Sequence, residues 1–219
     1  MLEYSLNKDR GIQTGLKLPP VHRGPYRCFN DLQRQEQEGR DYLIRTRLGQ
    51  SGILIMAPHG GSIEPGTGEI AEALAFPEHS FYAFEALIDP ADAQRLHLTS
   101  TCFDEPVALS LAARSTTIIT IHGCLECNRM VYLGGRDEKL KKRLVATLSQ
   151  AGFAVADNHP HPCFAGTHKD NICNKGLSTK GIQVEIALGL RRLLLTERNT
   201  SLKQGLFGQF IHAFRQGLL

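Results

Sequence analysis

The amino-acid sequence predicts an α/β protein with an open, mixed and mostly parallel sheet flanked by helices. Short runs of β-branched and apolar residues alternate with amphipathic stretches along most of the chain, a pattern typical of a sheet covered by helices. The run 53–57 is continuously apolar, as expected for a strand buried on both faces. The run 116–121 is rich in Thr and Ile, which favour strands, and each run leads into a His-Gly pair.

Local patterns predict the elements of the first half of the chain. Residues 42–47 alternate like a surface strand, and residues 65–75 place apolar side chains at helical spacing behind a proline in the first turn. Asp104 opens a predicted helix that runs to Ala113. The other elements predicted here are a short polar helix over 29–38 and strands over 81–88 and 97–100.

In the second half, residues 137–151 form a predicted helix that Gly152 ends. The segment 157–178 is rich in His, Pro, Asn, Gly and Cys and has no period, which is long for a loop without a function. We therefore expect it to be a functional loop. The other elements predicted here are strands over 130–133, 153–156 and 181–186 and closing helices over 188–195 and 202–214.

The composition predicts one ordered globular domain. The 219 residues are 42% hydrophobic and 21% charged, which disfavours disorder and coiled coil. We assign the domain to residues 27–219. Residues 1–26 contain closely spaced Pro and Gly and predict an extended or partly disordered N-terminal arm. The net charge of +3 is small and the charges are interspersed, so we expect no nucleic-acid partner.

The N-terminal sequence lacks the apolar core of a secretory signal, and no apolar run approaches the ~18 residues of a membrane span. We therefore expect a cytoplasmic protein that does not cross a membrane. In that reducing compartment the six cysteines are expected to act as small hydrophobes, ligands or nucleophiles rather than as disulfides.

Polar side chains follow the predicted buried strands. Ligands of open α/β sheets bind beyond the carboxyl ends of the strands, which selects His59, His122 and Glu185, with Glu64 a few residues beyond His59. Two histidines and a carboxylate, with a water in the fourth position, make a catalytic zinc site, and a second carboxylate can act as base. By spacing alone, a histidine at a strand end is also typical of a hydrogen-bonded turn.

Several longer stretches are more specific than this spacing. They are Ala57-Pro58-His59-Gly60-Gly61-Ser62-Ile63-Glu64-Pro65-Gly66-Thr67, Phe81 to Phe84 ahead of Glu85, Leu96-His97-Leu98-Thr99-Ser100-Thr101 with Phe103-Asp104-Glu105-Pro106, Ile121-His122-Gly123-Cys124, and Val131-Tyr132-Leu133-Gly134-Gly135. Together they resemble the poly-γ-glutamate hydrolase family of phage-type zinc peptidases. The resemblance extends from about Phe29 to the last helix.

This resemblance implies a zinc-carboxypeptidase-like fold and one catalytic Zn²⁺ held by His59, Glu64 and His122. It also places Glu185 in the position of the general base, which would take a proton from a zinc-activated water and pass it to the leaving amine. Four residues separate the first two ligands here, whereas two separate them in zinc carboxypeptidases. This difference concerns the shape of the first loop.

The resemblance further implies an anionic substrate, poly-γ-glutamate, in which every residue carries a free α-carboxylate. Cations and amides should therefore line the cleft. The candidates are Arg136, His168, Asn171, Asn174 and Lys175. Arg129, which follows His122 closely, is the candidate that stabilises the oxyanion.

Two other functions fit parts of the sequence. A deacylase of a small N-acyl amino acid on the same fold would need a closed pocket, whereas an enzyme that cuts a polymer internally needs an open groove. Some members of that family are labelled phage-related replication proteins, which suggests a non-enzymatic DNA-associated phage protein, but the sequence has no basic stripe or helix-turn-helix pattern. If the protein is encoded by a phage, we expect it to be released from the cytoplasm on host lysis.

The cysteines and a second histidine cluster offer further alternatives. Cys124 and Cys127 form a Cys-x-x-Cys pair beside His122, but the second ligand pair of a structural zinc site and the helix of a redox motif are missing. His159-Pro160-His161 is interpreted as a proline-stiffened loop. A bridge from Cys163 to Cys173 is expected only if the protein acts outside the cell.

Overall fold

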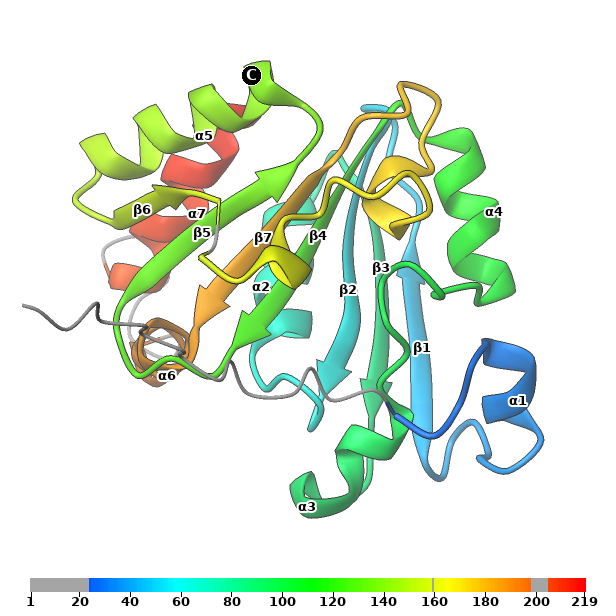
Figure 1. Ribbon diagram of the computed structural model, residues 1–219. Coiled ribbons are helices and arrows are strands. Elements are labelled where there is room, and N and C mark those ends of the chain that lie inside the picture. Colours follow the sequence, from blue (N-terminus) through cyan, green and yellow to red (C-terminus); the bar gives the residue numbers. More distant parts are fainter. Residues whose placement is uncertain (1–23, 159, 198–204) are drawn as a thin grey trace, which may run out of the picture.

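The computed structural model describes residues 24–158, 160–197 and 205–219, and in these ranges it contains one seven-stranded mixed sheet (Figure 1). The strands are β1 (Tyr42–Arg47), β2 (Ile53–Gly61), β3 (Ser80–Ala86), β4 (Thr117–Cys124), β5 (Met130–Gly135), β6 (Ala154–Asp157) and β7 (Ile182–Ala187). The α-helices are α1 (Phe29–Gln33), α2 (Thr67–Ala75), α3 (Pro90–Ala93), α4 (Pro106–Arg114), α5 (Glu138–Gln150), α6 (Leu188–Glu197) and α7 (Leu206–Leu218). Three short 3-10 helices are η1 (Gln94–Leu96), η2 (Pro162–Phe164) and η3 (Ile172–Asn174). The predicted fold class is confirmed.

The strand order β1-β3-β2-β4-β7-β5-β6 puts four parallel strands in the middle of the sheet. Strands β3, β2, β4 and β7 pair in parallel, β1 is antiparallel to β3, and β5 is antiparallel to β7. Strand β6 pairs in parallel with β5. The carboxyl ends of β2, β4 and β7 therefore meet at one edge of the sheet, as Figure 1 shows.

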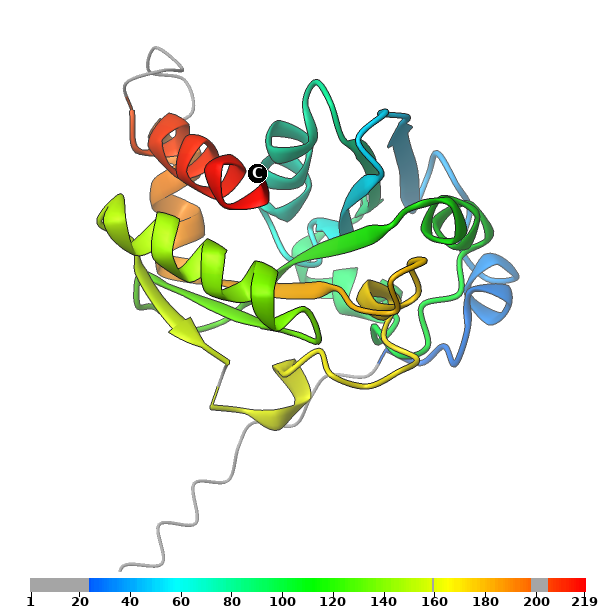
Figure 2. The ribbon, with the colours of Figure 1, turned by 90° about the horizontal axis from the view of Figure 1, so that it is seen from above.

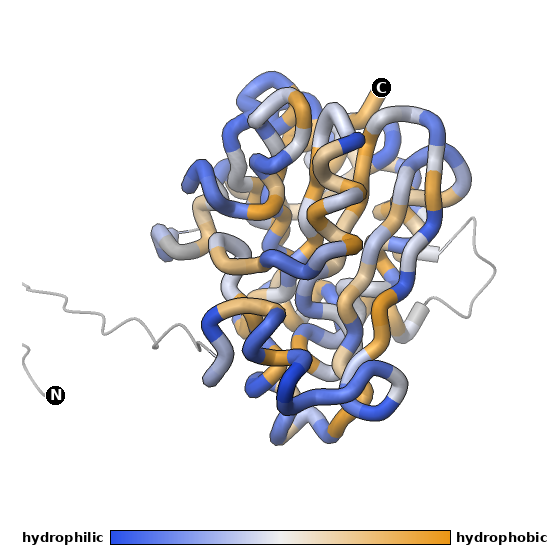
Figure 3. The backbone as a smooth tube through the Cα atoms, turned by 90° about the vertical axis from the view of Figure 1, so that its right-hand side faces the viewer, coloured by the Kyte–Doolittle hydropathy of each residue, from blue (hydrophilic) through white to orange (hydrophobic). Residues whose placement is uncertain are grey.

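Each face of the sheet carries its own core. One face packs against α2, α5, α6 and α7, with Ile55, Ile119 and Val184 pointing toward these helices (Figure 2). The other face packs against α1, α4 and the segment around Phe103, with Leu54, Met56 and Ile118 pointing toward them. Figure 3 shows hydrophobic stretches mainly in the middle of the molecule and hydrophilic ones mainly in the outer turns. Even and odd positions of a strand therefore belong to different cores.

Three predictions about these elements are wrong, namely one strand, one helix cap and one strand end. Residues 97–100 are not a strand but an irregular segment after η1. Asp104 does not cap α4, because Glu105 accepts the bonds from the first backbone N–H groups of that helix. Instead, Oδ1 of Asp104 accepts a hydrogen bond from the backbone N–H of Phe29 at the start of α1. Strand β2 also continues past Ala57 through the His-Gly pair, where the sequence predicts that it stops.

Most of the predicted N-terminal arm and the start of the last predicted helix lie outside the described residues. Residues 1–23 of the predicted arm are not described, and Tyr26 beyond them donates a hydrogen bond to Glu36 at 2.6 Å. The predicted start of the last helix at Leu202 also falls outside, and α7 is described from Leu206. Among the helices that the structure describes, none combines the length and apolar character needed to cross a bilayer.

Candidate metal centre

A bulge in β2 brings His59 to the correct face of the sheet. Ala57 pairs with Ala83 and Gly60 pairs with Glu85, so β2 uses one more residue than β3 between these two pairs. Strict alternation from Ala57 would turn His59 toward the helices of the first face. The extra residue turns it to the opposite face, where its ring contacts Phe103.

His122 and Glu185 reach the same face by ordinary strand geometry. They are direct register partners on the parallel strands β4 and β7. Both side chains are buried, at 3% and 2% exposure. Because side chains that share a register position on neighbouring strands point to the same face, the two groups lie side by side.

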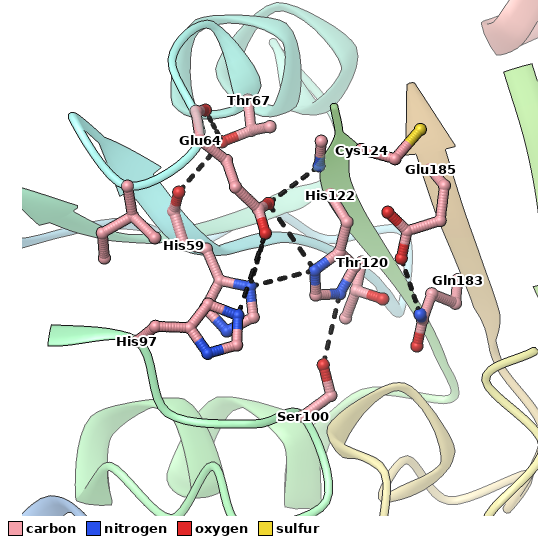
Figure 4. A network of polar contacts seen from close by, with 12 residues as sticks. His59, Glu64, Thr67, His97, Ser100, Thr120, His122, Cys124, Gln183 and Glu185 are labelled. Carbon is pink, nitrogen blue, oxygen red and sulfur yellow. Dashed lines mark hydrogen bonds and ion pairs between the residues drawn. The ribbon is translucent and has the colours of Figure 1, made fainter. Parts of the chain in front are cut away.

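Glu64 is supplied by the turn between β2 and α2. Its backbone N–H donates to the carbonyl of His59, and its own carbonyl accepts from the hydroxyl of the buried Thr67 at 2.8 Å. The side chain then accepts a bond at Oε2 from the backbone N–H of Gly123, 2.8 Å away. These bonds hold the carboxylate between β2 and β4 (Figure 4).

The three side chains converge on one point. Nδ1 of His59 lies 3.1 Å from Nδ1 of His122 and 3.1 Å from Oε1 of Glu64. One potential ligand atom from each residue lies within 4.8 Å of the others, and the part of the chain that the structure describes contains no other such group. Two imidazole nitrogens and one carboxylate oxygen are the donor set of a catalytic zinc site.

The surroundings of His59 fit a cation at this point. Its Nε2 lies 2.7 Å from the carbonyl oxygen of Leu98, which can only accept, so Nε2 carries a proton. In the neutral ring, Nδ1 then presents a lone pair to the carboxylate of Glu64. Two electron-rich atoms 3.1 Å apart repel each other unless a positive charge lies between them.

The pKa directions agree with these roles. Burial, followed by the neighbouring His59, lowers the pKa of His122 well below its usual range, so this ring is neutral and has a lone pair to donate. Burial, followed by the charge of Glu64, raises the pKa of Glu185 well above its usual range. Glu185 thus holds a proton more tightly than an exposed glutamate does.

His97 is a third histidine at the centre, which the sequence does not assign to it. Its ring stacks on that of His59 with centroids 3.9 Å apart, and its Nε2 lies 4.0 Å from Oε1 of Glu64. Burial and the neighbouring His59 lower the pKa of His97 to about 3. The segment that was predicted as a strand therefore contributes a neutral imidazole to the wall of the site.

The centre opens into a cavity of about 470 Å³. The segment 99–101, the loop 162–168, Asn171 and Gln183 form its walls together with the residues above. No lysine or arginine belongs to the described lining. The predicted functional loop thus covers the site, and its donors to a substrate are hydroxyl, amide and imidazole groups.

The structure brings some of the predicted substrate-binding residues to this cavity and leaves others outside it. His168 and Asn171 line the cavity. Asn174 is buried beside it and bonds to backbone groups of its own loop at Gly166 and Gly181. Three cations lie outside the lining, namely the exposed Arg129 and Arg136 and the half-buried Lys175.

A buried amide chain supports Glu185. Gln183, on the same strand and face, donates from Nε2 to Oε1 of Glu185 at 2.8 Å, and its own Oε1 accepts from Nδ2 of Asn171 at 2.7 Å. In the sequence Gln183 is only a polar interruption of an apolar strand. That interruption is the signal that could have identified it, because a buried amide requires partners.

Arg191 of α6 connects the segments that carry the site. Its guanidinium is 1% exposed and donates to the carbonyls of Pro65, Cys124 and Ile186 at 2.6, 3.1 and 3.0 Å. These carbonyls follow Glu64, His122 and Glu185 closely in the chain. The guanidinium fills the space next to Gly123, where an added Cβ would meet its Cζ at 2.4 Å. Nothing in the helical pattern of 188–195 indicates this role.

Among the described residues, the cysteines and the second histidine cluster do not form another metal site. Cys124 is buried and Cys127 is exposed, both as free thiols, and neither belongs to the ligand group. Cys173 is also a free thiol, so the conditional bridge to Cys163 is not formed in this structure. The ring of His161 is tilted by 55° against that of Phe164, with the ring centroids 5.3 Å apart, whereas His159 lies outside the described residues.

Several known proteins are similar to this chain in sequence and in fold. The model of a family described as poly-gamma-glutamate hydrolase matches residues 26–213. The UPF0714 protein YndL of Bacillus subtilis is 39% identical over 170 residues, which cover 77% of this chain and 66% of the relative. The SPbeta prophage-derived UPF0714 protein YoqZ of the same organism is 38% identical over 167 residues, or 76% of this chain and 60% of the relative. This chain thus spans between three fifths and two thirds of the length of these relatives.

Two solved structures match the fold closely. A bacteriophage poly-gamma-glutamate hydrolase superposes with a TM-score of 0.81 at 28% identity, covering 90% of this chain and 97% of the other. A structure of YndL described as apo and zinc-free superposes with a TM-score of 0.80 at 35% identity, covering 90% and 98%.

Proposed function

Because this chain belongs to the poly-gamma-glutamate hydrolase family, we propose that it is a zinc-dependent hydrolase that cleaves the γ-glutamyl amide bonds of poly-γ-glutamate. The observation that carries the proposal is the convergence of ligand atoms from His59, Glu64 and His122 within 4.8 Å at the edge of a cavity. The description of the YndL structure as zinc-free supports zinc as the ion.

His59, Glu64 and His122 would hold one ion, which when bound would polarise an amide carbonyl and make a water more acidic. Hydrogen bonds to the backbone already hold two of these ligands in place. The Leu98 carbonyl fixes the tautomer of His59, and the backbone N–H of Gly123 orients the carboxylate of Glu64.

Glu185 is the proposed general base. It lines the cavity and is the register partner of His122, so its carboxylate lies beside the ligands without being one of them. It would take a proton from the attacking water and give it to the nitrogen as the C–N bond breaks. Its raised pKa suits the second half of this cycle, because the carboxyl keeps the proton until the proton passes to the leaving nitrogen.

The α-carboxylates of the substrate would bind to neutral donors first. The hydroxyls of Thr99, Ser100 and Thr101 line the cavity, and so do His168 and Asn171. Asn174 would act by shaping the loop. Arg136 and Lys175 would meet only the parts of a long polymer that extend beyond the cavity. The role of Arg129 at the oxyanion stays a prediction from the sequence.

Metal analysis and polymer digestion test the proposal together. We expect stoichiometric zinc in the purified protein, shortening of poly-γ-glutamate that stops after chelation, and no turnover in the Glu185→Gln variant with its zinc retained. Zinc without polymer cleavage would favour the deacylase of a small N-acyl amino acid. Absence of zinc would contradict the metal site, and near wild-type turnover of Glu185→Gln would contradict the assigned base.

A further inference from the structure

We propose that Gln183 is a positioning residue that holds Oε1 of Glu185 as a fixed acceptor and leaves Oε2 as the oxygen that takes and returns the proton. The inference rests on the proposed function, because it concerns the same base. It depends on the order of donors and acceptors in the amide chain that joins the functional loop to β7. Figure 4 shows the last link of this chain, between Gln183 and Glu185.

One end of the amide chain is fixed by a backbone donor. The N–H of Cys173 lies 3.1 Å from Oδ1 of Asn171, and a backbone N–H can only donate. The other side of the Asn171 amide must therefore be its NH₂ group. That group faces Oε1 of Gln183 at 2.7 Å and donates to it.

The other end is fixed by a backbone acceptor. Nε2 of Gln183 lies 3.3 Å from the carbonyl oxygen of Phe164, which can only accept. The same Nε2 lies 2.8 Å from Oε1 of Glu185. Both ends thus require the same orientation of Gln183, with its NH₂ group toward Glu185.

This orientation makes the two oxygens of Glu185 unequal. Oε1 receives a hydrogen bond from Gln183, and when the carboxyl is protonated the carbonyl-type oxygen is the better acceptor. The proton is therefore carried on Oε2, which points away from Gln183 in Figure 4. Asn171, Gln183 and Glu185 are 4%, 3% and 2% exposed, so loss of a bond in the chain leaves a buried polar group without its protein partner.

Two substitutions change the amide chain without touching the metal ligands. Gln183→Met removes the donor while keeping the side-chain length. Asn171→Asp keeps the acceptor for Cys173 but places an oxygen opposite Oε1 of Gln183, which favours a flipped Gln183 amide that turns its oxygen toward Glu185. We expect each variant to lower kcat ~10-fold or more with the zinc content unchanged, and Gln183→Met to keep KM within about twofold as well.

The double variant separates positioning from general loosening. Once Gln183→Met has removed the amide, there is nothing left for Asn171→Asp to flip, so the double variant should lose no more kcat than Gln183→Met alone. Additive losses would overturn the proposal, as would kcat values within about twofold of the wild type in the single variants.

A matched control comes from the same turn. Cys173 is as buried as Asn171, and its thiol contacts the carbonyl of Gly166, whereas only its backbone N–H enters the amide chain. Cys173→Ala should lower the melting temperature and preserve kcat. An equal kcat loss in this control would assign the effect to loop packing and overturn the proposal. If kcat falls only in Glu185→Gln and not in the Gln183 and Asn171 variants, the role of Gln183 is overturned and the proposed function stands. Near wild-type turnover of Glu185→Gln would overturn both the role of Gln183 and the assigned base.

Discussion

The Nδ1 atoms of His59 and His122 lie 3.1 Å apart, although the two residues are 63 positions apart in the sequence. Both rings are buried on the same face of the sheet. Two ring nitrogens at this separation, beside a carboxylate, are arranged to share a cation. Their approach depends on the bulge in β2, because regular alternation would send His59 to the opposite face.

Replacing either ring should remove the metal. We expect His59→Ala and His122→Ala to lose zinc and hydrolytic activity together, since two remaining protein ligands bind the ion weakly. Elemental analysis of the purified variants measures the zinc. Cys124→Ser, which changes a buried thiol near the same strand end, should keep both. Zinc loss in the cysteine variant would instead revive a structural site at Cys124 and Cys127.

Glu185 should make the metal-free protein less stable as the pH rises. Its folded-state pKa is raised above the unfolded value, so the folded chain holds the proton more tightly. The associated stability is complete below the unfolded pKa and is lost as the pH rises toward the folded pKa. We compare the unfolding free energies of Glu185→Gln and the wild type, both treated with chelator. We expect the difference, variant minus wild type, to increase between about pH 5 and about pH 8. Urea titrations of both proteins give this difference, and a constant difference would contradict the raised pKa.

Arg191 should stabilise both the fold and the site. Its removal in Arg191→Met leaves the carbonyls of Pro65, Cys124 and Ile186 without their donor in a buried place. We expect a loss of about 3 kcal/mol or more in unfolding free energy and a weaker zinc affinity. Denaturant unfolding and competition with a chelator measure the two effects. Arg192→Met is the matched control, because this neighbour is exposed and should cost less than about 0.5 kcal/mol.

The length of the substrate should separate two groups of predicted binding residues. Arg136 and Lys175 lie outside the cavity lining, whereas His168 is part of it. We expect Arg136→Ala and Lys175→Ala to raise KM a few-fold for long polymer only, because charges outside the cavity contribute weakly and at a distance. His168→Ala should raise KM for short γ-glutamyl oligomers as well. Steady-state kinetics with both substrates test this, and equal effects of the outer cations on short oligomers would contradict the placement.

Much of the local structure was predictable from the sequence because it depends on neighbours in the chain. The period of 42–47 recurs as β1, and the helical spacing in 65–75 recurs as α2, which begins at Thr67. Gly152 follows the end of α5 in the left-handed conformation, as its position predicts. Residues 97–100 have the pattern of a strand, but they pair with no strand of the described sheet. His97, Thr99 and Ser100 line the cavity instead.

The residue types of the candidate site were predictable from the sequence alone. His59, His122 and Glu185 lie toward the carboxyl ends of apolar strands, and parallel strands end at a common edge, so their meeting follows from the strand pattern and the fold class. Glu64 is identified by its motif. How these groups are held could not be predicted in this way. The bulge that turns His59, the stacking of His97, the amide chain through Gln183 and the three bonds of Arg191 all join residues from separate elements. Such contacts depend on register and packing between distant segments, which no local pattern records.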